Sequence, residues 1–181
     1  MSIQQDTSQD RSSLLESIDR TQILQNLLKL NNRLLAPFST HLEKRHKISL
    51  NEFRVLMLIG DLGTTASHEL AERLGVNTMA VSRAVGSLNR HGRISVDVDP
   101  MSRRRKVLRL TEEGRRLYAE MTPTTDGVSA YLFEALRADE VLAFNHYVQT
   151  LTARLEARDE KGRSIFLERT RPDAGSDDSA A

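Results

Sequence analysis

The residues best suited to chemistry in this chain are cationic and lie between positions 77 and 116. Arg103, Arg104, Arg105 and Lys106 form one uninterrupted basic run. Four positive charges this close repel one another unless an anion compensates them, and the phosphates of duplex DNA or the electronegative floor of an AT-rich minor groove provide such an anion. The run therefore indicates a polyanionic partner.

The distribution of charge supports the same interpretation. The 181-residue chain has a net charge of only +1, but its segments differ: residues 1–76 are neutral, residues 77–116 carry +6 and residues 117–181 carry −5. Concentrated positive charge is typical of a surface that meets phosphates. From charge alone, a basic face that contacts only solvent is an equal alternative.

A second group of candidate residues precedes the basic run. A helix is expected from Thr78 to about His91, with Asn77 as its N-cap and Val81, Ala84 or Val85, and Leu88 on its buried face. The exposed start of this helix then presents Thr78, Met79, Ser82 and Arg83. A guanidinium matches guanine in the major groove, hydroxyls can donate or accept, and methionine can pack on a thymine methyl. A phosphate contact is the alternative for Arg83.

A helix-turn-helix must position these side chains. Ala71, Gly75 and Val81 have the required spacing: a small residue where two helices cross, a glycine that supplies the positive φ of the turn, and an apolar residue that fills the angle. Residues 65–74, with Thr65 as the expected cap, form the first helix. The alternating runs 94–98 and 106–110, joined by a turn at 99–102, predict a β-hairpin with a basic tip. Helix and hairpin together indicate a winged helix-turn-helix, in which both elements face the nucleic acid.

The remaining segments are mainly helical. Capping boxes at Ser13 to Glu16 and Ser49 to Glu52 predict helix starts. The first begins a long amphipathic helix that Pro37 kinks or divides, and the second begins a helix that ends near Ile59. Thr111 is the expected cap of a helix bent or weakened by Pro123 and Gly127.

The expected fold is mainly α with a small β-hairpin wing. Five regions follow: an arm at 1–12, a dimerisation helix region at 13–48, the winged domain at 49–111, C-terminal dimerisation helices at 112–160 and a flexible tail at 161–181.

The last long helix carries the clearest repeat of the chain. Its apolar residues are spaced 3, 4, 3 and 4, which is the seam of two helices packing side by side. With Leu24 and Leu28 of the first helix, these residues are the expected homodimer interface: Val141, Phe144, Val148, Leu151 and Leu155.

The motifs resemble those of one family. The stretches Glu69-Leu-Ala-Glu-Arg-Leu-Gly75 and Ala80-Val-Ser-Arg-Ala-Val85, then Asp99-Pro100, Arg103-Arg104 and Leu108-Arg-Leu-Thr-Glu-Glu-Gly114, look like the multiple antibiotic resistance regulator (MarR) family. The resemblance covers residues 20 to 155 in element order. It implies a dimer joined by the first and last helices, two winged domains on a pseudo-palindromic operator, and repression relieved by a small ligand.

The chain departs from the family pattern at the wing. Ser102 stands where the family usually has Asp before the paired arginines, and Gly86 stands where an acidic or polar residue is frequent. By resemblance, Arg104 enters the minor groove. Without those carboxylates, this arginine is either held less rigidly or held by Asp97 or Asp99 instead.

The resemblance also implies an effector pocket between the dimer helices and the winged domain. Five residues are weak candidates for it, because each is more often a surface or core residue than a ligand contact: Phe38, His41, Arg45, His46 and Arg54. The identity of the effector, and whether the chain represses or activates, stay open.

Other classes of protein fit the sequence less well. The chain has no glycine-rich phosphate loop, nucleophile elbow or paired histidines at metal spacing, so we expect no catalysis and no cofactor. Without cysteine, thiol sensing and disulfides are excluded. Without a secretory signal or an apolar run of membrane length, we expect a cytoplasmic protein with no membrane partner. Two alternatives stay open: a metal-sensing regulator that uses His41, Glu43 and His46, and a winged domain that contacts only protein or RNA.

Overall fold

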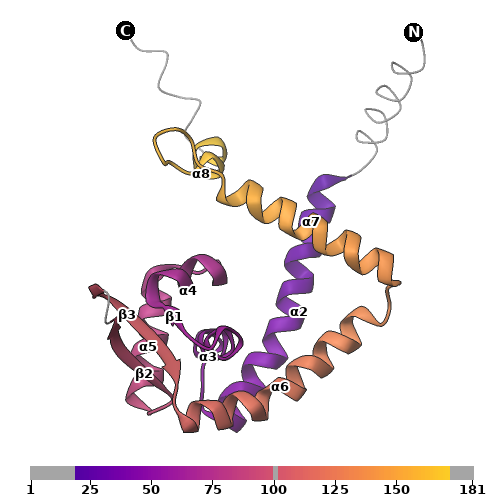
Figure 1. Cartoon of the computed structure of the whole chain (residues 1–181). Coiled ribbons are helices and arrows are strands. Elements are labelled where there is room, and N and C mark those ends of the chain that lie inside the picture. The colour runs from indigo at the N-terminus through magenta and orange to yellow at the C-terminus, as the bar shows by residue number, and fades with distance from the viewer. Residues whose placement is uncertain (1–18, 100–101, 172–181) are drawn as a thin grey trace, which may run out of the picture. The chain divides into compact units, whose positions relative to one another are not determined.

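The computed structural model describes residues 19–99 and 102–171, without the side chains of residues 67, 68, 99 and 102–105. The described chain is mostly helical and contains one small sheet (Figure 1). It forms two compact units that divide after Met121, within the helix α6. The elements in chain order are α2 (Arg20–His46), α3 (Leu50–Leu62), β1 (Thr65–Ala66), α4 (Ser67–Leu74), α5 (Thr78–Arg90), β2 (Ile94–Asp99), β3 (Ser102–Leu110), α6 (Glu112–Phe133), α7 (Ala138–Glu156) and α8 (Ile165–Thr170).

The core of the first unit joins α3, α5 and the sheet. Leu56, Ile59, Leu70, Leu88 and Leu108 have no exposed surface. They come from α3, α4, α5 and β3, so burying them fixes α4 and α5 against α3 and the hairpin. The apolar residues predicted for the buried face of the second helix of the helix-turn-helix, Val81, Ala84 and Leu88, lie in this core.

The sheet has three strands, one more than predicted. Its order is β1-β3-β2, and all pairs are antiparallel. Thr65 pairs with Leu108 and Ala66 with Val107, so the prediction that Thr65 caps the next helix was wrong. Ala66 occupies the cap position, and the Thr65 hydroxyl donates to Glu69 Oε2 at 3.1 Å instead. A strand of two residues has too few positions to show an alternating pattern, which is why it was missed.

Two helices contain a proline and continue through it. The helix α2 is 27 residues long and continues unbroken through Pro37, so the proline does not divide it in two. Its N-cap is Asp19, and the capping box expected at Ser13 lies outside the described residues. The helix α6 likewise continues past Pro123. A proline removes one backbone hydrogen bond, and the neighbouring turns of a long helix retain theirs.

The second unit contains the end of α6, the helix α7 and a folded C-terminal segment. The tail predicted to be flexible from residue 161 instead includes the helix α8, which corrects that prediction as far as residue 170. Asp159 accepts hydrogen bonds from the backbone N–H groups of Lys161 and Arg163 at 2.9 and 2.8 Å, and Ser164 caps α8. These are local polar interactions, which hydrophobic periodicity does not reveal. Residues 172–181 lie outside the described part.

Candidate nucleic-acid interface

The turn between α4 and α5 has the geometry that its sequence predicted. Gly75 ends α4 at φ +60°, in the left-handed region where a side chain is disfavoured. Its N–H group donates to backbone oxygens of α4, and Val76 N donates to Ala71 O at 3.3 Å. Ala71 is half-buried and Val81 is buried, as a close helix crossing requires. The helix-turn-helix is thereby confirmed at the level of backbone and packing.

The first two turns of α5 expose the residues that the sequence singled out. Thr78, Met79, Ser82 and Arg83 are all exposed, Met79 at 66%. The Arg83 Nε group donates to Met79 O at 3.4 Å, so this side chain lies back along its own helix. Asn77 caps α5, and its Oδ1 atom accepts from Ala80 N at 2.8 Å. The side-chain oxygen of Asn77 is therefore engaged within the helix start.

The wing and α5 flank one hollow. This hollow has a volume of about 520 Å³. Thr78, Ser82 and Asn89 line it from α5, and Val96 and Lys106 line it from the hairpin. The strand β3 includes Arg103, Arg104 and Arg105, but their side chains lie outside the described part of the chain. The start of α5 and the base of the basic run therefore border the same surface.

One carboxylate considered as a support for Arg104 has another partner. Asp97 Oδ2 lies 3.6 Å from Arg109 Nη1 and accepts from Ser95 Oγ at 3.2 Å. This pair crosses from β2 to β3 on the face of the hairpin that carries Ser95. The side chain of Asp99, the other carboxylate considered, lies outside the described part of the chain.

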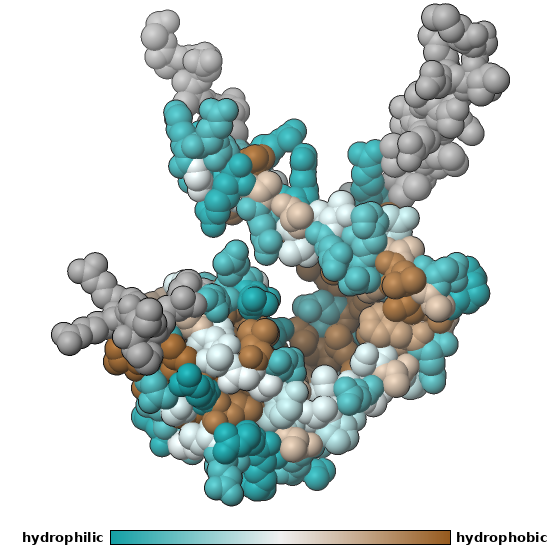
Figure 2. Space-filling view, viewed as in Figure 1, coloured by the Kyte–Doolittle hydropathy of each residue, from teal (hydrophilic) through white to brown (hydrophobic). Residues whose placement is uncertain are grey.

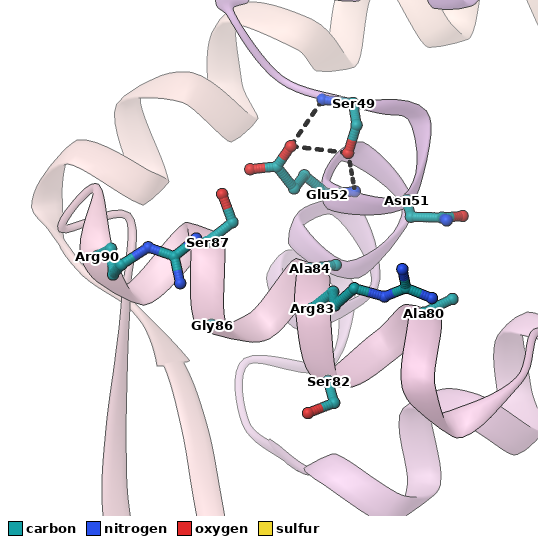
Figure 3. A pocket seen from close by; sticks show the side chains of 10 residues that line it. All are labelled: Ser49, Asn51, Glu52, Ala80, Ser82, Arg83, Ala84, Gly86, Ser87 and Arg90. Carbon is teal, nitrogen blue, oxygen red and sulfur yellow. Dashed lines mark hydrogen bonds between the residues drawn. The ribbon is translucent and has the colours of Figure 1, made fainter.

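A second hollow, on another flank of α5, was not predicted (Figure 3). This crevice has a volume of about 700 Å³ and lies between the N-terminus of α3 and one side of α5. Its charged and polar lining consists of Ser49, Asn51 and Glu52 from the start of α3 and Ser82, Arg83, Ser87 and Arg90 from α5. Asn51, Ser87 and Arg90 of this lining were not among the predicted site residues. The spacing of Arg83, Ser87 and Arg90 by 4 and 3 residues was a signal that they share a helix face.

Glu52 is the buried charge of this crevice. It is 9% exposed, and its Oε2 atom accepts from Ser49 N at 2.8 Å and from Ser49 Oγ at 2.7 Å, while Ser49 Oγ accepts from Glu52 N at 3.3 Å. The predicted capping box is therefore present. Burial raises the pKa of this carboxyl, but hydrogen bonds from Ser49 and Ser87 outweigh burial and hold the pKa below its usual value. Glu52 is thus a buried carboxylate between the start of α3 and α5.

The five residues considered for an effector site lie in different surroundings. Phe38 packs against the core, with its ring 4.8 Å from that of Phe53 in an edge-to-face arrangement. Arg45 and His46 both lie 3.8 Å from a carboxylate oxygen of Glu120, and the rings of His41 and His46 are 6.0 Å apart. Burial lowers the pKa of His46, against the opposing effect of Glu120. Arg54 is half-buried, and none of the five lines either hollow beside α5.

The metal-sensing alternative finds no support in this geometry. Among the described residues, no three histidine, aspartate or glutamate side chains lie close enough together to hold a metal ion. His41, Glu43 and His46 therefore do not form the cluster that this alternative required.

The predicted dimer residues are apolar and largely uncovered within the single chain. On α2, Leu24 and Leu28 are 57% and 56% exposed. On α7, Val148, Leu151 and Leu155 are 41%, 53% and 54% exposed, whereas Val141 and Phe144 are half-buried. Phe144 lies with its ring 6.2 Å from that of Phe133. Five of the seven predicted residues thus leave much of their apolar surface open in the described part of the monomer.

A helix-turn-helix followed by a β-hairpin, with a third short strand completing an antiparallel sheet, defines a winged helix-turn-helix protein. The family model of the MarR family matches residues 48–106, which run from just before α3 into the wing. The match falls on the segment in which the motifs of the sequence suggested this family.

Solved structures share this fold. BpsR of Bordetella bronchiseptica, whose DNA binding is regulated by 6-hydroxynicotinic acid, is 23% identical at a TM-score of 0.62, over 72% of this chain and 98% of that one. FabT of Streptococcus pneumoniae, solved in complex with DNA, is 22% identical at a TM-score of 0.64, over 76% and 98%. PcaV of Streptomyces coelicolor, solved with its natural ligand, is 22% identical at a TM-score of 0.56, over 67% and 88%.

Neither a curated relative of the sequence nor a membrane-spanning helix in the described part of the chain was found. No curated protein matches the sequence. Within the described residues, no helix is both long enough and apolar enough to cross a lipid bilayer.

Proposed function

We propose that this protein is a sequence-specific, DNA-binding regulator of transcription that acts as a homodimer on a pseudo-palindromic operator. The observation that carries the proposal is the shared surface of α5 and the wing. Exposed Thr78 and Ser82 border the same hollow as Lys106, at the base of the most basic run of a nearly neutral chain. A polyanion with grooves fits such a surface.

The two elements have different roles in this proposal. The exposed start of α5 enters the major groove, where side chains with donors, acceptors and methyl groups distinguish base pairs. The wing tip follows the phosphates or enters the adjacent minor groove. The proposed contacts are Asn77, Thr78, Met79, Ser82, Arg83, Arg103, Arg104, Arg105 and Lys106.

The dimer follows from the uncovered apolar residues of α2 and α7. Leucine and valine side chains that remain 41–57% exposed in the monomer gain free energy when a second copy covers them. Two winged domains related by a two-fold axis then meet half-sites about one helical turn apart.

We further propose that a small molecule relieves repression. BpsR is regulated by 6-hydroxynicotinic acid and PcaV binds a natural ligand, so this fold accommodates such control in those proteins. In this chain, the group around Phe38, His41, Arg45, His46 and Arg54 joins α2 to α3 and the start of α6. A ligand there would act on the helices that support the winged domain.

The protein has no catalytic role and works in the cytoplasm, where the DNA is.

Binding to duplexes at increasing salt tests the proposal. A pool of random duplexes first yields the preferred operator, and affinity for that operator should fall with a log-log slope of about −0.9 per neutralised phosphate. Arg104→Ala should weaken binding to operator and random duplex alike. Arg83→Ala should also relax base preference, by roughly 1 to 3 kcal/mol at one position.

Fluorescence anisotropy on both duplexes measures these effects. Equal losses on operator and random duplex for Arg83→Ala would contradict its role in base reading. A wild type that binds no duplex in dilute buffer would refute the function itself and favour a module for protein contacts.

A further inference from the structure

The crevice between α3 and α5 offers a second surface for an anionic strand. We propose that the DNA backbone crosses the mouth of this crevice and that Arg90 and Asn51 contact its phosphates, beside the bases read by Arg83. This inference rests on the proposed function and extends the DNA surface beyond the flank of α5 that borders the wing.

The arrangement of the arginines is the first argument. Arg83, Ser87 and Arg90 form one stripe of α5 along the crevice, and Figure 3 shows both guanidinium groups extending beside it. At a rise of about 1.5 Å per residue, Arg83 and Arg90 start about 10 Å apart along the helix axis. Arg83 also bends back towards Met79, away from Arg90. The two groups therefore suit separate positions along one strand.

A second argument is that Arg90 and Asn51 have hydrogen-bond donors without a partner in the described part of the chain. Some other arginines of the chain pair with nearby carboxylates, such as Arg116 of α6 with Glu113 at 2.8 Å and Arg163, in the segment before α8, with Asp159 at 2.7 Å. Within the described residues, Arg90 and the side-chain amide of Asn51 make no hydrogen bond or ion pair. Their donors are available to phosphate oxygens, which arginine binds in a fork.

Glu52 decides which kind of anion the crevice accepts. Its buried carboxylate lies on the floor and would repel an anion that entered deeply. That carboxylate already accepts hydrogen bonds from Ser49, and the two arginines leave the lining with a net positive charge. A phosphate at the mouth meets the arginines without reaching Glu52. A DNA strand passing over the surface fits this arrangement better than a small free anion.

A purely structural role for Arg90 makes a different prediction. Arg90 lies in the last turn of α5, where a cation stabilises the negative end of the helix dipole. A residue with that role alone would change the stability of the fold but not the number of phosphates bound. Arg154 lies in the last turn of α7 and serves as the matched control.

The experiment compares full-length wild type, Arg90→Ala, Arg90→Lys and Arg154→Ala by anisotropy on operator and random duplexes across a salt series. Melting temperatures are measured alongside. Arg90→Ala should bind both duplexes more weakly by the same factor, with a salt slope about 0.9 smaller in magnitude. From about 50 to 200 mM salt, wild-type affinity should then fall about 3.5-fold more than that of the variant. Arg90→Lys should keep the wild-type slope, and Arg154→Ala should match wild type.

Each failure has its own meaning. If wild type binds the operator and Arg90→Ala has the same slope and affinity, the inference is wrong while the proposed function stands. If Arg90→Ala loses base preference, Arg90 reads bases and the phosphate contact is wrong. If wild type binds no duplex, both proposals fall. Asn51→Ala changes a residue of α3 rather than α5, and it should also weaken binding to both duplexes.

Discussion

At the scale of single residues, Glu52 lies between the start of α3 and α5. Its carboxylate accepts hydrogen bonds from the backbone N–H and the hydroxyl of Ser49, and the hydroxyl of Ser87, in the second half of α5, helps to lower its pKa. A capping residue usually stabilises only its own helix. Here the same carboxylate also borders the helix that presents the candidate base contacts.

We expect Glu52 to contribute acid-sensitive stability. Its pKa is held below the usual value, so its contribution is complete above the unfolded pKa of about 4.3 and is lost as the pH falls through the folded value. Glu52→Ala removes these hydrogen bonds and should cost roughly 1 to 2 kcal/mol at neutral pH. Urea unfolding at neutral pH and at a pH below about 4 measures both effects.

The matched variant is Glu52→Gln, which retains a capping-box residue but cannot ionise. Its stability should decline less than that of wild type between the two pH values. Equal declines for wild type and Glu52→Gln would show that other groups carry the acid sensitivity.

At the scale of elements, the junction between the wing and α6 depends on close backbone contact. Thr111 Oγ1 donates to Gly92 O at 2.6 Å, and Thr111 N donates to Arg93 O at 3.1 Å. Gly114 N donates to Thr111 Oγ1 at 3.1 Å, which confirms Thr111 as a cap of α6. A Cβ atom at Gly114 would lie 1.8 Å from Arg93 O, so only glycine fits there. The junction thus sets where α6 leaves the winged domain.

Gly114→Ala should therefore destabilise the fold. The added methyl meets backbone, which cannot move aside as a side chain can, and overpacking of this kind costs typically about 1 to 3 kcal/mol or more. Gly127→Ala, in the same helix, is the control: nothing lies within 4 Å of the position that its methyl group would take, and it should stabilise by roughly 0.5 to 1 kcal/mol. Denaturant midpoints of both variants test the pair, and similar midpoints would disprove the close contact.

At the scale of the whole molecule, apolar surface remains uncovered outside the core. Tyr131, Leu136 and Leu142 are 77%, 39% and 71% exposed. Figure 2 shows apolar surface where α6 leads into α7, and the seam residues of α7 continue along that helix. Exposed apolar groups of this number favour association with another chain.

We expect Val148→Asp to disrupt the homodimer. Val148 lies in the middle of the seam, and a carboxylate there would lose its hydration when a second copy packs against it. Gln149→Asp adds the same charge at the next, exposed position and should leave the dimer intact. Sedimentation velocity distinguishes the two forms. A Val148→Asp variant that still sediments as a dimer would refute the assigned interface.

The amino-acid sequence by itself determined the helix-turn-helix, the hairpin and the helix caps at Ser49, Asn77 and Thr111. Each depends on interactions between residues close in the chain: a glycine with positive φ at 75, a side chain that reaches a backbone N–H three residues on, and apolar residues at a fixed period. Such interactions can be recognised from spacing. The exposed set on α5 followed directly, because one face of a helix is defined once its buried face is known.

Only the tertiary structure decided the strand at Thr65, the crevice beside α5 and the folded segment after residue 157. The strand exists because β3 offers it partners more than 40 positions away. The crevice exists because packing brings the start of α3 beside the face of α5 that carries Arg83 and Arg90. Contacts between distant segments depend on how elements pack, and local sequence does not encode which side chains the packing brings together.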